Sequence, residues 1–455
     1  MADKTSIVEY NRIEKVDIHG DDHHASSTDV DVTTAIGSEI DEKHDDPNTE
    51  AAAPLVPPDG GFGWVVVAGC FFAVFASYGF LNSFGVYAEY YKSSQYKSTP
   101  SAVVGLIGTL QVATLNLSAP LSGWLTEHLG FNVVIALGGL IMAIGMVITS
   151  FATHIWMQLV FQGILTGLGA SMVVTLAITV PAQWFTNKRG LATGIAFAGA
   201  GFGGVAFAPI LRALISSVGI EWASRISGII VAVLVAVSSL AVRRFLPPSA
   251  TRQRFFDFTQ LKDMRAAMFI VYSILFYGVI FIPFFYLPLF ATRNGYSAST
   301  GSTLALLANL GSAFGRILGG FVSDRIGKFN TLILSISLAL LSTLVLWLPF
   351  QTIGTAATYA VLYGIASGGQ ITMLSVTVAQ VFGVARLQSM MGLVMAFGAV
   401  GVLPGTPGAG QLLDSLGHGT NFTPLIVYFA IVLALQLIAP IYLRLSLSKK
   451  VFVKY

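Results

Sequence analysis

The chain has 455 residues, of which 54% are hydrophobic and only 10% are charged, and its mean hydropathy is +0.74. Soluble domains carry about 25% charged residues, so this composition excludes a soluble globular protein and predicts that most of the chain lies in lipid. Cys70 is the only cysteine, which excludes an intrachain disulfide and any cysteine-based metal or iron–sulfur site.

The first 58 residues differ from the rest of the chain in charge. They hold 14 Asp or Glu and 4 Lys or Arg, whereas the remaining 397 residues hold 8 acids and 21 bases. A segment this acidic and this poor in apolar residues cannot bury enough surface to fold, so we expect residues 1–58 to be a disordered cytosolic tail. The first 30 residues contain no continuous apolar stretch, and we expect no cleavable signal peptide.

Twelve apolar segments follow, and each is close to the roughly 20 residues that an α-helix needs to cross a bilayer. They predict an all-α membrane protein with twelve transmembrane helices and both termini on the same side. The segments are 64–87, 101–123, 131–151, 155–180, 190–213, 222–242, 266–290, 299–322, 330–349, 354–380, 387–408 and 423–444.

The distribution of basic residues indicates the orientation, because Lys and Arg are retained on the cytoplasmic side. With the amino terminus inside, 15 of the 21 bases fall in cytoplasmic connections and the carboxyl tail, 5 fall in outer loops and helix ends, and Arg316 falls within a span. We therefore predict cytosolic termini. The longest connection, 243–265, is a predicted cytosolic linker between six-helix halves at 59–242 and 266–445, and 446–455 is a basic cytosolic tail.

The two predicted halves are similar in sequence. The run from Gly123 to Gly130, Gly-Trp-Leu-Thr-Glu-His-Leu-Gly, recurs 197 residues later as Gly-Phe-Val-Ser-Asp-Arg-Ile-Gly from Gly320 to Gly327. Glycine and proline positions of the fifth segment recur in the eleventh with a displacement of 198 residues. Parallel six-helix repeats of this kind flank a central site and rock against each other. The repeats therefore predict a solute transporter that works by alternating access.

Three motifs resemble those of known families. The repeated loop resembles the loop signature of the major facilitator superfamily, which implies a role in a cytoplasmic gate for Asp324, Arg325 and Glu127. The opening motif at the first segment looks like that of the monocarboxylate-transporter family, and Trp184-Phe185-x-x-Lys-Arg-Gly resembles that family's segment entering the fifth span. The resemblance covers residues 59–445 and implies a major-facilitator fold of two parallel six-helix repeats. The residues of the opening motif are Asp59, Gly60, Gly61, Phe62, Gly63 and Trp64.

Arg316 is the charge within a span that must be explained. It lies about 12 Å inside its helix, eight residues before Asp324, and a charge there costs at least ~2.5–3.5 kcal/mol on insertion scales. Two interpretations stay open. The forked guanidinium of Arg316 could bind a substrate carboxylate in a bidentate pair, or Arg316 could be a structural arginine bonded to carbonyl groups. By resemblance, Arg316 matches the eighth-helix arginine with which monocarboxylate transporters hold the substrate anion.

Other polar side chains at membrane depth predict a central substrate site, although each could equally bond a neighbouring helix. The animal members of the family place a lysine where this chain has Asn82 and an aspartate where it has Ser312. The family's lysine and aspartate are implicated in proton coupling, so lactate/proton symport by that mechanism is not supported here. The chain looks more like the fungal branch, whose members handle varied organic solutes. The site residues expected beside Arg316 are Tyr78, Asn82, Asn309 and Gln370.

These observations favour a secondary transporter of a monocarboxylate or related organic anion, with Arg316 as the anion-binding residue. One alternative is an importer or exporter of a larger metabolite such as riboflavin or a secondary-metabolism product, and another is a non-transporting nutrient receptor. The chain has no phosphate loop and no His-Glu-x-x-His motif, so we expect no enzyme, cofactor or metal site. The expected partners are a small organic solute, with or without protons, and the lipid bilayer, with no nucleic acid; the resemblance favours the plasma membrane.

Overall fold

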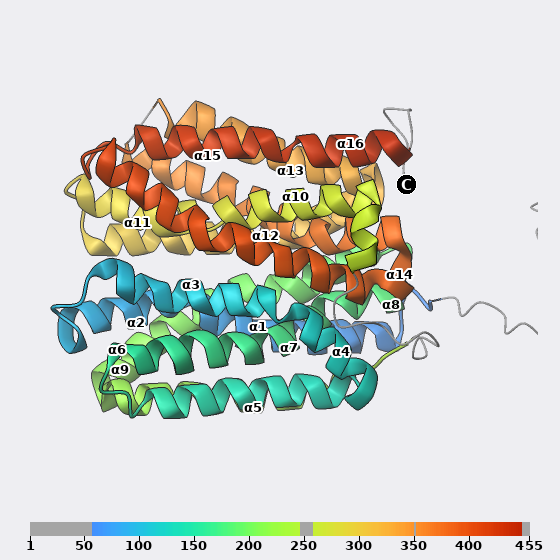
Figure 1. Cartoon of the computed structure of the whole chain (residues 1–455), viewed down its shortest axis with the longest axis horizontal. Coiled ribbons are helices and arrows are strands. Elements are labelled where there is room, and N and C mark those ends of the chain that lie inside the picture. The colour runs from blue at the N-terminus through green and yellow to red at the C-terminus, as the bar shows by residue number, and fades with distance from the viewer. Residues whose placement is uncertain (1–56, 246–257, 350–351, 448–455) are drawn as a thin grey trace, which may run out of the picture. The chain divides into compact units, whose positions relative to one another are not determined.

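A computed structural model describes residues 57–245, 258–349 and 352–447. Most of the predicted acidic tail (1–56), part of the linker (246–257) and most of the basic tail (448–455) lie outside the described residues. The regular structure of the described residues is helical throughout. Figure 1 shows the helices in two groups, α1 to α9 and α10 to α16.

The first group begins at the opening motif and ends before the linker. Its helices are α1 (Phe62–Asn82), α2 (Phe84–Tyr90), α3 (Ser101–Leu117), α4 (Ala119–Leu129), α5 (Phe131–Thr149), α6 (Ile155–Met157), α7 (Thr166–Thr179), α8 (Pro181–Trp184) and α9 (Arg189–Ala241). Two π-helical turns, Tyr91–Gln95 and Gln158–Leu165, extend α2 and join α6 to α7.

The second group follows a short 3₁₀ turn at Phe258–Lys262. Its helices are α10 (Met264–Val279), α11 (Ile282–Arg293), α12 (Ala298–Ile326), α13 (Lys328–Ser342), α14 (Ile353–Ser415), α15 (Thr423–Gln436) and α16 (Ile438–Leu447), and the π-helical turn Thr343–Trp347 extends α13. Side chains define several of the helix starts. The Ser297 hydroxyl accepts a hydrogen bond from the Thr300 N–H, and Thr352 and Thr355 form a capping box.

Among the described residues, nine helices are long and apolar enough to cross a membrane, and the bent pair Val103–Leu117 and Ala119–Leu129 makes ten. Both α9 and α14 are two helices joined at one residue, because Gly219 (φ 79°) and Gly383 (φ 75°) have non-helical backbone. When each is divided there, the number of spans is consistent with the predicted twelve. Positive φ favours glycine, which explains how these helices turn without the longer loops that the sequence had suggested.

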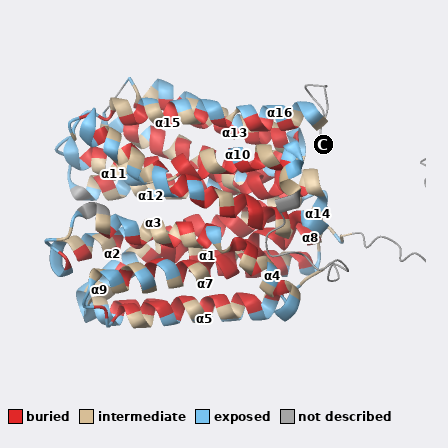
Figure 2. Ribbon diagram, viewed as in Figure 1, coloured by how far each residue is buried: buried red, intermediate tan, exposed pale blue. Residues whose placement is uncertain are grey.

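The outer faces of the helices are apolar, as a protein surrounded by lipid requires. In the second part of α9, Val233, Val237 and Leu240 are 56%, 63% and 72% exposed. Figure 2 shows buried residues on the sides of the helices that face one another and exposed residues on outward sides such as that of α15. These faces and the spans together describe a multi-pass integral membrane protein.

Glycine allows the closest helix contacts in both groups and between them. A Cβ atom on Gly79 of α1 would lie only 2.5 Å from the Gly203 Cα of α9. At the boundary of the groups, a Cβ atom on Gly320 of α12 would overlap the Gly190 carbonyl oxygen of α9. The two groups therefore meet backbone to backbone at the end of the bundle where the repeated loop lies.

Candidate substrate cavity and gate

A cavity of about 740 Å³ is lined by residues of both groups of helices, from α1 to α14. Most of its wall is apolar and rich in aromatic rings, including Phe84, Phe197, Phe276, Phe281, Phe284 and Phe285. Among the described residues that line it, Glu89 is the only acid, and Arg212 and Arg316 are the only bases. A largely apolar cavity with a few polar groups is the usual form of a site for an organic ligand.

The mouth of the cavity is marked by an exposed ion pair. The Arg212 Nη2 atom of α9 lies 3.5 Å from the Glu89 Oε2 atom of α2, and it donates to the Ser302 hydroxyl of α12 at 3.3 Å. Exposed pairs contribute little to stability, about 0–1 kcal/mol. The basic-residue count predicts that this end of the bundle faces outward, away from the cytosol.

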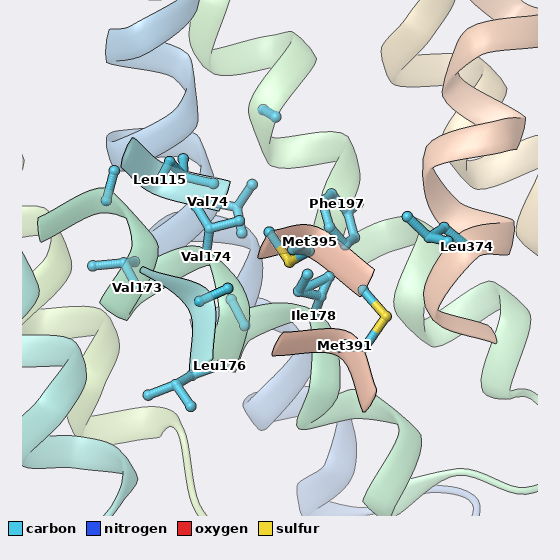
Figure 3. Close-up of a cluster of buried hydrophobic side chains, with 14 of the residues drawn as sticks. Val74, Leu115, Val173, Val174, Leu176, Ile178, Phe197, Leu374, Met391 and Met395 are labelled. Atoms are coloured by element: carbon cyan, nitrogen blue, oxygen red, sulfur yellow. The ribbon is translucent and has the colours of Figure 1, made fainter. Parts of the chain in front are cut away.

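An apolar floor closes the other end of the cavity. Figure 3 shows Met391 and Met395 of α14 near Ile178 of α7 and Phe197 of α9. All four line the cavity and belong to one buried hydrophobic cluster. Since they come from both groups of helices, these contacts separate the cavity from the predicted cytosolic end.

Arg316 is 4% exposed and reaches the cavity wall from α12. Its Nη1 donates to the Phe197 carbonyl of α9 at 2.7 Å, whereas its Nε has no hydrogen-bond partner among the described residues. Ser312, one turn earlier on α12, also lines the cavity, is 1% exposed and has an unpartnered hydroxyl. The guanidinium therefore combines a structural bond on one nitrogen with an unused edge, the Nε–Nη2 edge that pairs side-on with carboxylates.

Three more of the predicted site residues line the same cavity. Tyr78 on α1 is near enough to Arg316 for the two groups to interact electrostatically. The Asn82 Nδ2 donates to the Ala200 carbonyl at 3.2 Å, and the Asn309 Nδ2 donates to the Ala305 carbonyl at 2.9 Å. The fold thus brings Tyr78, Asn82, Asn309 and Arg316 together from opposite groups of helices.

Gln370 does not belong to the cavity lining. It is 3% exposed on α14, and its Oε1 accepts a hydrogen bond from the Gln436 Nε2 of α15 at 3.0 Å. Ser312 and the aromatic wall were not among the predicted site residues. The spacing of Ser302, Asn309, Ser312 and Arg316 along one face of α12 is the signal that could have indicated Ser312.

Asp324 connects the two groups at the predicted cytosolic end. Its Oδ1 accepts from the Gly190 N–H and its Oδ2 from the Leu191 N–H, both at 2.9 Å. These N–H groups are at the start of α9, where the helix dipole and the free donors favour an anion. A carboxylate of the second group therefore caps a helix of the first.

Asp59 binds the turn immediately before that helix start. Its Oδ1 accepts from the Thr186 and Asn187 N–H groups at 2.7 and 2.9 Å, and its Oδ2 accepts from the Asn187 Nδ2 at 3.0 Å. The segments that resembled two separate family motifs are therefore in contact, with Asp59 at the centre of the contact.

Aromatic rings extend this contact between the two motif segments. The rings of Phe62 and Trp184 have centroids 5.8 Å apart, and those of Trp64 and Phe185 are 4.8 Å apart. A Cβ atom on Gly63 would approach the Phe185 ring at 3.0 Å. Gly60 and Gly61 lead the chain into α1, and Gly61 has a positive φ of 57°.

The first copy of the repeated loop lies differently. Glu127 interacts with Arg244 of its own group: burial lowers the pKa of Arg244, and the Glu127 carboxylate raises it. Gly123 faces the other group, since a Cβ atom there would lie 3.5 Å from the Gln388 Cγ. Arg325 is exposed, with its guanidinium 4.1 Å from the centre of the Phe321 ring.

Within the described ranges, no three His, Cys, Asp or Glu side chains are grouped as a metal site would require.

The chain matches the family model described as Major Facilitator Superfamily over residues 67–406. It is 32% identical over 392 residues to the MFS-type transporter opdF of Penicillium oxalicum, covering 84% of this chain and 92% of that protein. It is 33% identical over 365 residues to the aspyridones efflux protein apdF of Emericella nidulans, covering 79% of this chain and 74% of that protein.

The fold is similar to that of the human organic anion transporter MFSD10, with a TM-score of 0.64 and 16% identity. The match covers 85% of this chain and all of that one. Because the family model spans most of the membrane region and the fungal relatives align over most of their own lengths, the chain belongs to the major facilitator superfamily.

Proposed function

We propose that this protein moves a largely apolar organic acid, larger than a short monocarboxylate, across a membrane by alternating access. The observation that carries the proposal is a cavity of about 740 Å³ with an aromatic wall and one deeply buried arginine. Membership of a transporter superfamily supports transport over catalysis.

The size and the wall of the cavity favour the larger metabolite over the short monocarboxylate that the sequence had favoured. Cavities of about 300–1,000 Å³ hold drug-sized ligands, and a short acid would leave most of this wall exposed to water. Removing apolar surface from water contributes about 25 cal/mol per Å². Aromatic side chains therefore supply much of the affinity for a ligand that covers them. The relative apdF is named for the efflux of aspyridones, which supports a secondary metabolite as the class of solute and export as the direction.

In this proposal the buried arginine fixes the acidic end of the solute. A carboxylate or other acidic oxygen pair accepts from the Nε–Nη2 edge of Arg316, and the Ser312 hydroxyl donates a further hydrogen bond. The burial of Arg316 strengthens this pair, because the Phe197 carbonyl is the one hydrogen-bond acceptor that the described residues provide for the guanidinium. Tyr78 lines the same cavity and interacts electrostatically with Arg316, so its hydroxyl is a further candidate donor to the acid.

The gate residues control which end of the cavity is open. Release of the Asp324 carboxylate from the start of α9, together with separation of Met391 and Met395 from Ile178 and Phe197, would open the cytosolic end. The same proposal assigns Glu127 and Arg325 to the support of this end. The contact between the opening motif and the segment entering the fifth span supports a relationship to the monocarboxylate-transporter family. The proposed location is the plasma membrane.

The test is uptake of labelled aromatic acids into vesicles that contain the full chain. Arg316→Gln should lower saturable transport of the acids by at least about tenfold, since it removes a buried charge-assisted pair. Arg316→Lys should retain part of it, because the charge remains and the fork is lost. Arg293→Gln is the matched control, since Arg293 is exposed and lies outside the cavity lining.

Uptake that prefers neutral analogues, or that survives Arg316→Gln, would show that Arg316 is structural. A receptor is distinguished by deletion of residues 1–55. A transporter should keep its flux without this segment, whereas a receptor that signals through it would lose its output.

A further inference from the structure

We infer that the cavity also selects its solute for a hydrogen-bond donor, an O–H or N–H group, held by Asn82 and Asn309 at a distance from the acidic end. This inference rests on the proposed function, because it concerns the same cavity. It narrows the solute to an elongated, largely apolar acid that carries a hydroxyl or N–H group away from its acid.

The hydrogen bonds of the two asparagines fix which amide atom is available. Asn82 and Asn309 each place a nitrogen against a main-chain carbonyl, which can only accept. Each Oδ1 is therefore the amide atom left over, and no hydrogen bond to either oxygen is present among the described residues. Both residues line the cavity and are partly exposed in it. The pair therefore presents two acceptors to a solute.

The two asparagines meet across one residue of α9. A Cβ atom on Gly204 would lie 3.1 Å from the Asn82 Cβ and 3.5 Å from the Asn309 Oδ1. Glycine at this position leaves room for side chains from α1 and α12 to approach the same point from opposite groups of helices. At this point the Asn309 Oδ1 faces a donor of the solute directly, while the Asn82 amide has its nitrogen nearest, 3.6 Å from the same Cβ position, so its Oδ1 is directed elsewhere along the cavity lining.

The position of this pair relative to Arg316 follows from α9. Arg316 bonds the Phe197 carbonyl, Asn82 bonds the Ala200 carbonyl, and Asn309 faces Gly204. At 1.5 Å per residue, these contacts are about 4.5 and 10 Å along the helix from the Arg316 contact. The cavity thus has donors at its inner end and acceptors one to two helical turns further out.

Because donors and acceptors lie at different ends of the cavity, the site can reject close analogues of its solute. A solute without the donor would cover the asparagine oxygens and leave them without a hydrogen bond, which is more costly than the loss of an average bond. A solute with the donor but without the acid would leave Arg316 uncompensated. Each end of the solute is therefore recognised by a different set of side chains.

The experiment compares two probes, para-hydroxybiphenylcarboxylate and para-methoxybiphenylcarboxylate, in equilibrium binding to the full chain in lipid nanodiscs. Two para-linked rings separate the acid from the hydroxyl by roughly the two helical turns that the cavity provides. The wild-type chain should bind the hydroxy acid about tenfold more tightly than the methoxy acid.

Substitution of the acceptors should remove this ratio. Asn309→Leu or Asn82→Leu alone should lower it to about threefold, and the double variant should bring it close to one while both acids still bind. Asn330→Leu is the matched control, because Asn330 makes the same bond to the carbonyl four residues earlier but lies outside the cavity lining. If the double variant does not fold, the two single variants carry the test.

Equal binding of the two acids to the wild-type chain, or a ratio that survives both single substitutions, would overturn the inference. The proposed function fails by a different result: neither acid binds, or both bind Arg316→Gln as tightly as the wild type. A ratio of about ten that is lost with the asparagines, together with binding lost in Arg316→Gln, supports both.

Discussion

At the scale of single residues, Ser312 determines whether Arg316 has a free edge. It lies one turn from Arg316 on the same face of α12 and has an unpartnered hydroxyl. A carboxylate at this position would pair with the guanidinium and occupy the edge that we assign to the substrate. The serine therefore leaves Arg316 as an unneutralised positive charge.

We expect Ser312→Asp to weaken binding of organic acids at neutral pH by about tenfold, because the new carboxylate competes for Arg316. An aspartate beside an arginine has its pKa below the usual value of about 3.9. Protonation on acidification removes the competitor, so binding should recover only at strongly acidic pH. Ser216→Asp, on an exposed part of α9, should leave binding unchanged.

The measurement is equilibrium binding of an aromatic acid that stays ionised across the pH range, such as a sulfonate. Undiminished affinity in Ser312→Asp at neutral pH would show that the 312 side chain does not face the anion-binding edge of Arg316.

At the scale of elements, the start of α9 is held by two carboxylates. Asp59 binds the N–H groups of residues 186 and 187, and Asp324 binds those of residues 190 and 191. One carboxylate comes from the same group of helices and the other from the opposite group. Asp59 thus fixes the turn at residues 186 and 187 that leads directly into the helix start bound by Asp324.

Asp324→Asn should weaken the cytosolic closure, because hydrogen bonds to a charged group contribute about 1.5–3 kcal/mol. We expect an increase of about tenfold in the reactivity of a cysteine introduced by Ile178→Cys toward a thiol reagent supplied from the cytosolic side. The natural Cys70 is fully buried and should contribute little background. Asp414→Asn, at an exposed position, is the control, and equal reactivity in both variants would contradict the gate.

Asp59→Asn should slow transport severalfold, because it loosens the turn at residues 186 and 187 that leads into α9. Solute affinity should not change, because Asp59 lies outside the cavity lining. Combined with Asp324→Asn, its effect should be smaller than the product of the two single effects, since the two carboxylates bind adjacent parts of the same segment, residues 186–191. Multiplicative rates in a double-mutant cycle would show that the two carboxylates act independently.

The elements also show what sequence could predict. Hydropathy and the repeat were sufficient for the helical membrane fold, because a span must be long and apolar. Arg316 was predicted as a site residue because a charge in a span is rare, and it lines the cavity. Gln370 was placed at the cavity because a polar residue at membrane depth has no visible partner in the sequence, and Gln436 lies 66 residues away. The contact between Asp59 and the 186–187 turn depends on chain folding over more than 120 residues, so neither motif alone could reveal it.

The two copies of the repeated loop illustrate a second limit. They match in sequence, yet Asp324 caps a helix of the opposite group whereas Glu127 interacts with Arg244 of its own. A duplicated motif predicts a duplicated local turn, and both copies do end at a glycine with positive φ, Gly130 and Gly327. The partner beyond the turn depends on the neighbouring residues, which differ between the two copies.

At the scale of the whole molecule, the described state is closed at the end that holds Asp324 and open at the end that holds Glu89. Gly123 and Gln388 come from opposite groups and are near neighbours at the closed end. The variant with Gly123→Cys and Gln388→Cys should form a disulfide in this state, because a Cβ atom at position 123 would lie 3.5 Å from the Gln388 Cγ, the position that the sulfur of a cysteine at 388 would occupy. Oxidation should stop transport, and a reductant should restore it.

Binding of an organic acid from the predicted outer side should persist in the oxidised variant, since the cavity and its mouth are not altered. Either single cysteine variant is the control. Continued transport with the disulfide fully formed would show that the cytosolic end opens by a movement other than separation of α4 from α14.

In the proposed cycle, the charge of Arg316 would determine how the membrane voltage acts on the protein. With an anion bound, the cavity is electrically neutral, and the loaded protein reorients without electrical work. The empty protein carries the positive charge, and movement of one charge through a potential of 100 mV is worth about 2.3 kcal/mol. An inside-negative voltage therefore favours return of the empty cavity toward the cytosol, which would drive export of organic acids without a co-transported ion.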